Sequence, residues 1–345
     1  MRLLLLTLTL TLSLTTLAAE PAAAADAFDP QKLQILRTYL QEHGSSSMLI
    51  VHKGEVAFSY GDVHKPHLIH SVRKALLNSL YGMYVAKGVI DLDKTLAELN
   101  IDDVHGLSET EKSATLRQLL QSRSGVYHPA TAESAWMKQQ KPPRGSHKPG
   151  EFHYYNNWDF NAAGAIFTRL TGKGVLEAFF SEIAEPIGMQ DLSGKLSRTQ
   201  VGVNDDEIPQ VDGFYQFEPA KSQFPAYHMR LSAADLARYG QLYLQNGQWN
   251  GQQLVPAEWI RQSTQMISET NPRFNLGYGM LWAVVQAREA GKRNSFYHTG
   301  VGVHFLAVYP EDDMVVVHRV NTEQDYSFTP NDLYPIIGMV FAAKN

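Results

Sequence analysis

The spacing of apolar residues divides the N-terminal part of the chain into a helix, a β-hairpin and a second helix. A buried helix face is predicted near the start, and its members are Leu33, Ile35, Leu36 and Leu40. Residues 47–59 have the pattern of two strands that turn at Lys53-Gly54. A helix that begins at Ser71 follows and is expected to end near Lys87-Gly88. Its apolar face consists of Leu76, Leu77, Leu80 and Met83.

Helical and loop patterns dominate from about residue 91 to residue 210. Helices are predicted over 113–122 and 159–170, and the small residues Ala162, Ala163 and Gly164 of the second would permit close packing. Between them, the proline-rich segment 141–145 predicts a surface loop.

Strand patterns return in the C-terminal part. A helix opens after residue 231, with Ser232 as N-cap and Asp235 as the second member of a capping box. The predicted strands that follow are 278–285, 295–297, 305–309 and 314–320. A last helix is predicted over 331–341.

Strands near both ends with helices between them predict a mixed α/β (α+β) fold. An antiparallel sheet would be built from residues 26–90 and 211–345 and flanked by helices, and residues 91–210 would form a mostly helical insertion. A cleft between two such parts is a common place for an active site.

The first 25 residues have the layout of a secretory signal peptide. Arg2 precedes an uncharged apolar stretch, and small residues offer cleavage sites after residue 19 or after residue 25. The apolar run is shorter than the roughly 20 residues that a membrane-spanning helix needs. We therefore expect a periplasmic or secreted protein without a stable membrane span.

Composition narrows the chemistry. The chain has no cysteine, which excludes disulfides, thiol catalysis and zinc–thiolate sites. The formal net charge is −5 and there is no basic block, so nucleic-acid binding has no electrostatic support. Three histidines, His64, His67 and His70, recur at three-residue spacing, but Pro66 interrupts any helix that would align them. Ordinary histidines are the better interpretation, and we expect neither a metal nor a cofactor.

A serine and a lysine lie one helical turn apart in Ser71-Val72-Arg73-Lys74. Side chains at this spacing lie about 5–6 Å apart at Cβ, so Lys74 can reach the Ser71 hydroxyl. A lysine held neutral could act as a base toward it. By itself the spacing is weak evidence, since chance gives roughly one Ser-x-x-Lys in a chain of this composition.

Two further stretches contain candidate chemistry. Residues 149–161 place tyrosines and asparagines in a loop before a helix, and residues 297–302 place a histidine before a glycine-rich turn. Taken alone, each is better explained as ordinary structure, a loop with packed aromatics and a strand end. There is no Gly-x-Ser-x-Gly elbow, which argues against an α/β-hydrolase.

Taken together in order, these stretches resemble the three motifs of the serine β-lactamase and penicillin-binding-protein superfamily. The motifs are Ser-x-x-Lys at 71–74, Tyr-x-Asn at 155–157 and His-Thr-Gly at 298–300. The resemblance is strongest to the class C β-lactamase-like branch, which also holds DD-peptidases, esterases and aminohexanoate-oligomer hydrolases. Further segments similar to that branch are 88–93, 119–126, 157–164, 231–244 and 305–321.

The tyrosine motif fits two registers, Tyr154 with Asn156 or Tyr155 with Asn157. In the family a Pro-Gly pair precedes the tyrosine. We select Tyr155 and Asn157, because Gly150 then lies five residues before the tyrosine.

The resemblance implies roles for these residues. Ser71 would be the nucleophile of an acyl-enzyme. Its base would be Lys74 or Tyr155, a choice that the sequence leaves open. Asn157 would orient Lys74 and a substrate amide. The backbone N–H groups of Ser71 and Val301 would form the oxyanion hole.

The resemblance also implies residues around the substrate. His298 replaces the lysine of true class C β-lactamases, and a histidine is fully charged only below about pH 6.5, which argues against strong antibiotic hydrolysis. Thr299 and Gly300 would contact substrate. Apart from the resemblance, Trp158 could line the cleft and contact substrate, although a core or surface aromatic is the better interpretation. Arg230 could meet a substrate carboxylate, although a structural ion pair is the better interpretation.

The sequence thus predicts a serine hydrolase of a small amide, peptide or ester. Peptidase, esterase, DD-carboxypeptidase and weak β-lactamase activities remain open within that class. The competing hypothesis is a non-catalytic penicillin-binding or peptidoglycan-sensing module, which the presence of all three motifs disfavours.

Overall fold

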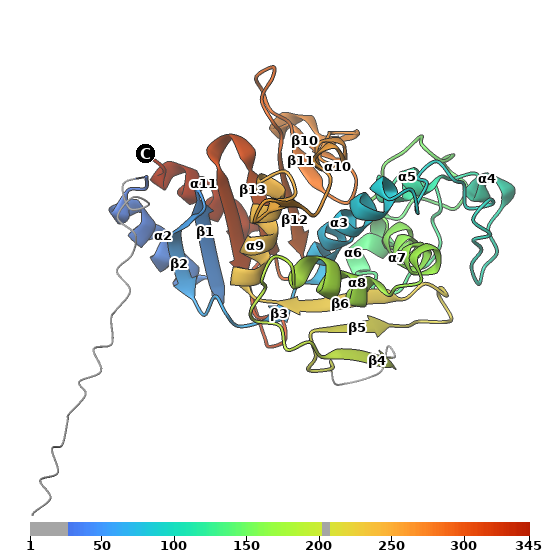
Figure 1. Ribbon diagram of the computed structural model, residues 1–345, viewed down its shortest axis with the longest axis horizontal. Coiled ribbons are helices and arrows are strands. Elements are labelled where there is room, and N and C mark those ends of the chain that lie inside the picture. Colours follow the sequence, from blue (N-terminus) through green and yellow to red (C-terminus); the bar gives the residue numbers. More distant parts are fainter. Residues whose placement is uncertain (1–26, 202–207) are drawn as a thin grey trace, which may run out of the picture.

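The computed structural model describes residues 27–201 and 208–345 (Figure 1). The predicted signal peptide lies outside the described residues. No helix in the described part of the chain is long and apolar enough to cross a membrane.

A sheet of eight strands joins the two ends of the chain. Its strands are β1 (Ser47–His52), β2 (Glu55–Gly61), β9 (Ser268–Asn271), β10 (Leu276–Tyr278), β11 (Ala283–Val285), β12 (Ser295–Gly300), β13 (His304–Tyr309) and β14 (Met314–Arg319). They lie in the order β2-β1-β14-β13-β12-β11-β10-β9, and neighbouring strands are antiparallel. The prediction of an antiparallel sheet flanked by helices is confirmed.

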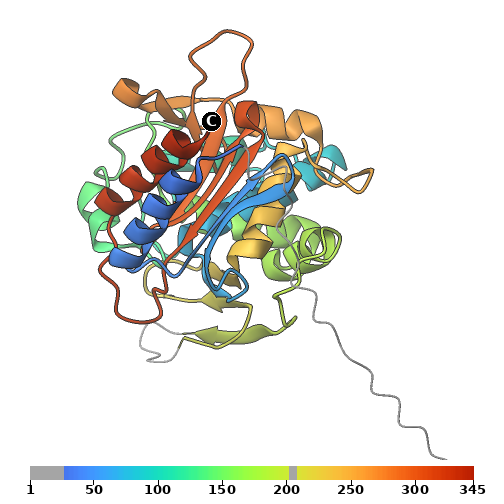
Figure 2. The ribbon, with the colours of Figure 1, turned by 90° about the vertical axis from the view of Figure 1, so that its left-hand side faces the viewer.

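Successive apolar side chains of the central strands point to opposite faces of the sheet, which explains why helices pack on both faces. In β1, Met48 and Ile50 join one apolar cluster, whereas Leu49 and Val51 join the other. The terminal helices α2 (Pro30–Glu42) and α11 (Pro330–Ala343) lie side by side over the first face (Figure 2). The helix α9 (Ala233–Leu244) packs against β1, β13 and β14 on the other.

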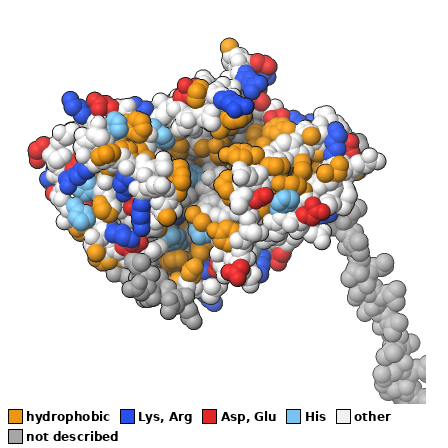
Figure 3. Space-filling view, turned by 180° about the vertical axis from the view of Figure 1, so that it is seen from behind, with side chains coloured by type: hydrophobic (Ala, Val, Ile, Leu, Met, Phe, Trp, Pro, Cys, Tyr) orange, Lys and Arg blue, Asp and Glu red, His pale blue; other side chains and the backbone are white. Residues whose placement is uncertain are grey.

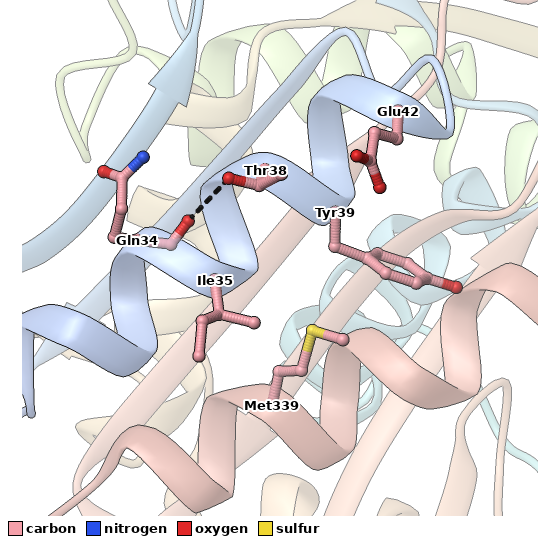
Figure 4. A pocket seen from close by; sticks show the side chains of 6 residues that line it. All are labelled: Gln34, Ile35, Thr38, Tyr39, Glu42 and Met339. Atoms are coloured by element: carbon pink, nitrogen blue, oxygen red, sulfur yellow. Dashed lines mark hydrogen bonds between the residues drawn. The ribbon is translucent and has the colours of Figure 1, made fainter.

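The first helix buries a narrower face than its sequence predicts. Leu36 and Leu40 are completely buried, but Ile35 is 59% exposed. It lines a shallow groove between α2 and α11, where Met339 of α11 lies across from it (Figure 4). The sheet covers only the side of the helix that carries Leu36 and Leu40, which lie one turn apart. Ile35, on the neighbouring side, therefore points to solvent.

The middle of the chain is mainly helical. Its helices are α4 (Glu109–Lys112), α5 (Leu116–Leu120), α6 (Ala135–Gln140), α7 (Asn157–Thr171), α8 (Val175–Phe179) and the π-helical turn η2 (Phe180–Ala184). The predicted close packing at Gly164 is present, because a Cβ there would lie 2.8 Å from Cε1 of Tyr227.

A second sheet, which the sequence patterns did not predict, lies beneath these helices (Figure 1). Its order is β3-β6-β5-β4, and the strands are β3 (His67–Leu68), β4 (Leu196–Val201), β5 (Gly213–Gln216) and β6 (Ala226–Leu231). These strands are short, and polar residues such as His228 and Arg230 interrupt their apolar pattern. The remaining small elements are α10 (Ala257–Ser263), η3 (Pro272–Phe274), η4 (Pro310–Asp312) and the hairpin of β7 (Gln248–Trp249) and β8 (Gln252–Gln253).

Two local predictions were wrong. Residues 278–285 are not one strand, because Leu281 adopts a left-handed conformation (φ 60°) and the segment turns from β10 into β11. The capping box at α9 is also only half formed. Ser232 Oγ accepts from the Asp235 N–H, but the Asp235 carboxylate accepts from the N–H groups of Gln190 and Asp191.

The helix α3 (Arg73–Ala86) lies at the centre of the molecule. The 3-10 turn η1 (His70–Val72) leads into it, and every residue from Arg73 to Tyr84 is buried. It contacts β6, α7, α8 and α10. A helix buried all round gives its polar residues a surrounding of low polarity, and this sets the chemistry described next.

Candidate active site

Three side chains meet at the start of α3. Lys74 Nζ donates to Ser71 Oγ at 2.9 Å and to the Tyr155 hydroxyl at 2.7 Å. Ser71 lies in η1, Lys74 in the first turn of α3, and Tyr155 in the loop before α7. The lysine therefore bridges a serine and a phenol that are 84 residues apart, the difference between positions 155 and 71.

The surroundings of Lys74 favour its neutral form. Its side chain is completely buried, and its Nζ lies 4.4 Å from the ring centroid of Tyr155 and 4.7 Å from that of Phe160. Among the described residues, no carboxylate forms an ion pair with it. Burial, followed by the charge of Arg73, holds the pKa of Lys74 well below its usual value.

Arg73 is a residue that the sequence reasoning did not select. Its guanidinium lies over the Tyr227 ring, 4.8 Å from the centroid, and its Nη2 donates to Asn161 Oδ1 at 3.3 Å. Only 2% of Arg73 is exposed. The signal in the sequence was an arginine at the start of a mainly apolar helix, next to the candidate base.

The tyrosine register is decided by these contacts. Tyr155 reaches Lys74, whereas the Tyr154 hydroxyl donates to the Met137 carbonyl at 2.6 Å. Burial raises the pKa of Tyr155 well above its usual value, so this phenol keeps its proton at neutral pH. The geometry therefore supports the Tyr155 register.

We predict different effects for substitutions of the two tyrosines, a loss of turnover at Tyr155 and a loss of stability at Tyr154. Tyr155→Phe removes the hydroxyl that Lys74 contacts and should lower the turnover of a p-nitrophenyl ester by about 10²-fold, with little change in melting temperature. Tyr154→Phe should lower the stability by about 1 kcal/mol and leave turnover within about threefold. Equal turnover losses in the two variants would contradict the chosen register.

His298 lies beside this group, on β12. Its ring centroid is 6.2 Å from that of Tyr155, and its Nδ1 contacts the Thr299 carbonyl at 2.8 Å. Because a carbonyl only accepts, Nδ1 carries the proton and Nε2 is bare. That Nε2 is buried and has no hydrogen-bond partner among the described residues. Burial lowers the pKa of His298 to about 3, so the ring is neutral at ordinary pH.

The end of β12 lies against the serine turn. A Cβ at Gly300 would come within 2.5 Å of the Ile69 carbonyl oxygen and 3.1 Å of the His70 Cβ. Only a glycine permits this approach. Thr299 precedes it on the strand, and Val301, at the turn that follows, is 52% exposed.

Asn157 does not contact Lys74 directly. Its Nδ2 donates to the Ala132 carbonyl at 2.7 Å, and its Oδ1 is buried with no hydrogen-bond partner in the part of the chain that the structure describes. The oxygen is therefore an unused hydrogen-bond acceptor. Asn157 was predicted to orient Lys74, but no hydrogen bond joins these two residues in the structure.

The prediction that Trp158 contacts substrate was wrong. The side chain is completely buried, its Nε1 donates to Asp103 Oδ2 at 2.7 Å, and its ring packs edge-on to Phe224. The first turn of α7 presents it to the core. Arg230 forms the structural ion pair that was favoured for it, since its Nη2 lies 2.7 Å from Glu323 Oε2.

The three N-terminal histidines have separate partners. His64 Nδ1 lies 3.1 Å from Asp191 Oδ2, and His70 Nε2 lies 2.8 Å from Thr322 Oγ1. His67 is buried, and its carbonyl accepts from Arg319. Within residues 27–201 and 208–345 no group of three or more His, Asp or Glu side chains could hold a metal ion.

Comparison with known proteins identifies the family. The Beta-lactamase family model matches residues 34–336, so the chain belongs to the β-lactamase family of serine hydrolases. Among curated proteins, none matches this chain.

Solved structures share the fold at low sequence identity. A candidate 6-aminohexanoate-dimer hydrolase from Bacillus anthracis has a TM-score of 0.65 and 20% identity, covering 89% of this chain and 80% of that one. The octameric penicillin-binding protein homologue from Pyrococcus abyssi has a TM-score of 0.65 and 18% identity, with coverages of 91% and 77%. A class C β-lactamase mutant has a TM-score of 0.65 and 13% identity, with coverages of 90% and 96%.

Proposed function

We propose that this chain hydrolyses an amide or ester bond through an acyl-enzyme on Ser71. The observation that carries the proposal is the position of Lys74 Nζ, within hydrogen-bond distance of both the Ser71 hydroxyl and the Tyr155 hydroxyl. A base must lie within such reach of the proton that it removes. Lys74 lies within this distance of the Ser71 hydroxyl, and it also contacts the Tyr155 hydroxyl, which can carry the proton onward.

The two pKa shifts favour Lys74 as the base. The pKa of Lys74 is lowered, so the amine has a lone pair available, and the pKa of Tyr155 is raised, which disfavours a phenolate. Ser71 Oγ would attack the carbonyl carbon while its proton passes to Lys74 Nζ. The proton would then move through the Tyr155 hydroxyl to the leaving nitrogen or oxygen, and the acyl group would stay on Ser71.

Deacylation would run the same path in reverse. Water would add to the acyl carbon, and its proton would pass through Tyr155 to Lys74. Lys74 would then give a proton to Ser71 Oγ as the bond between Ser71 and the acyl group breaks and the acid leaves. The backbone N–H groups of Ser71 and Val301 would stabilise the oxyanion in both steps, and each donor of this kind contributes about 10²–10³ in rate. Asn157, with its free Oδ1, would orient a substrate amide.

A neutral His298 argues for a substrate whose recognition does not depend on an anionic group. With its pKa near 3, His298 offers an acceptor nitrogen and no charge where a β-lactamase would hold a carboxylate with lysine. An uncharged amide or ester therefore suits this residue better than a β-lactam. Weak β-lactamase or DD-carboxypeptidase activity is the next alternative.

Two further features bear on where a substrate would bind. The face seen in Figure 3 is hollowed, and hydrophobic side chains border the hollow. Thr299 and Gly300, on the strand beside the serine turn, would contact a substrate along its backbone. We also propose that residues 1–25 direct the protein to the periplasm or outside the cell.

Labelling with a fluorophosphonate tests the proposal. We expect one covalent adduct, and peptide mass spectrometry should locate it on Ser71, because the neutral Lys74 activates this hydroxyl. The control is protein unfolded in urea, which should not react. An adduct elsewhere, or none, would refute the proposed nucleophile. Labelled penicillin that stays bound without release, together with no ester or amide turnover, would favour the sensing module instead.

A further inference from the structure

A chain of hydrogen bonds runs from a buried arginine to the residue before Ser71. Arg319 Nε donates to His304 Nδ1 at 3.0 Å, and His304 Nε2 lies 3.3 Å from Thr322 Oγ1. The same Thr322 oxygen lies 2.8 Å from His70 Nε2. Three segments distant in sequence therefore converge on one hydroxyl.

The proton positions in this chain follow from the arginine. A guanidinium only donates, so His304 Nδ1 must accept and His304 Nε2 must carry the hydrogen. That hydrogen points to Thr322 Oγ1, and the Thr322 hydroxyl, which can both accept and donate, shares its second hydrogen bond with His70 Nε2. His304 is thereby neutral, and burial lowers the pKa of His70 to about 4, so this ring is neutral as well at ordinary pH.

Arg319, at one end of this series of hydrogen bonds, is held firmly in place. It is completely buried, and its Nη2 donates to the carbonyls of His67 at 2.8 Å and Leu68 at 3.2 Å. Its Nη1 donates to the Leu231 carbonyl. The arginine thus ties the end of β14 to β3 and β6, the strands on the other side of the serine turn.

Thr322 contacts both segments that flank the proposed oxyanion hole. It bonds His70, which has a positive φ of 46°, a conformation uncommon for a residue with a side chain. On its other side, a Cβ at Gly302 would overlap the Thr322 Cγ2 methyl. Gly302 directly follows Val301, and His70 directly precedes Ser71.

We propose that Thr322 is a positioning residue that sets the spacing between the Ser71 and Val301 N–H groups. Its hydroxyl bonds the imidazole of His70, the residue directly before Ser71, and its methyl lies against Gly302 in the turn after Val301. This inference rests on the proposed acyl-enzyme function. Donors of an oxyanion hole act only at the correct position, so a small displacement should lower turnover rather than binding.

Thr322→Val and Thr322→Ser test the inference with p-nitrophenyl butyrate as substrate and a fluorophosphonate as label. The valine variant keeps the shape and loses both hydrogen bonds, and we expect kcat to fall by about 10–100-fold with KM within about threefold. The serine variant keeps the hydroxyl but loses the methyl, and we expect its kcat to lie above that of the valine variant and within about tenfold of the wild type. If the valine variant does not fold, Thr322→Ala replaces it.

Thr264→Val is the matched control, because its buried hydroxyl donates to the Ile260 carbonyl at 2.8 Å outside this chain of bonds. It should change stability but leave kcat within about threefold. Wild-type protein labelled at Ser71, with the valine variant as fast as the wild type, would overturn the inference alone. Equal losses in the valine and serine variants would also overturn it. Wild-type protein that is neither labelled nor active would overturn the proposed function and this inference together.

Discussion

Ser71→Ala and Lys74→Met are each expected to lower kcat/KM for p-nitrophenyl butyrate by at least about 10³-fold. The alanine variant removes the attacking oxygen, and the methionine variant keeps the length of the side chain but removes the amine that contacts Ser71 at 2.9 Å. Because the two groups act as one unit, the double variant should be no slower than the slower single variant. Initial rates at several ester concentrations give this comparison.

The same helix offers matched controls. Ser79→Ala removes another buried hydroxyl of α3, which donates to the Leu76 carbonyl, and Lys87→Met removes an exposed amine that pairs with Glu182. Both should keep kcat/KM within about threefold, since neither side chain reaches Ser71. Independent, multiplying losses in the Ser71 and Lys74 variants would show that Lys74 does not act through the Ser71 hydroxyl.

The free energy of unfolding of the wild type is expected to rise relative to that of Lys74→Met as pH increases above 7. The pKa of Lys74 is lowered in the folded protein, whereas an unfolded lysine titrates near 10.4. Between these two values the unfolded chain binds one more proton at Lys74 than the folded chain does. Raising the pH removes that proton from the unfolded state and so stabilises the folded state.

The slope of this difference has a physical upper limit. One proton gives about 1.4 kcal/mol per pH unit, so the change from pH 7 to pH 10 approaches about 4 kcal/mol. Urea unfolding of both proteins at pH 7, 8, 9 and 10 measures it, and other titrating groups cancel in the difference. Leu80→Met, which changes a buried apolar residue of the same helix, should show no slope against the wild type. A flat difference for Lys74→Met would mean that the folded protein keeps this lysine charged.

Much of the fold could be predicted because its signals are local. The β1–β2 hairpin turns at Lys53-Gly54, where both residues have positive φ, as the dipeptide predicts. The helices α3 and α7 also lie where their apolar spacing places them. The second sheet escaped because its strands are short and partly polar, and they are stabilised by neighbours distant in the chain. The signal peptide and its expected secretion remain predictions.

The candidate site divides in the same way. The sequence by itself determined which groups are present and that Ser71 and Lys74 share a helix face, since three-residue spacing is a property of the helix alone. Only the tertiary structure decided which tyrosine meets Lys74, a contact across 81 residues, and that Trp158 belongs to the core. It also decided that Lys74 and His298 are buried beside a second cation or amine and therefore favour their neutral forms. The reason is physical: the charge of a side chain depends on how much water and which charges surround it, and both are set by contacts between distant segments.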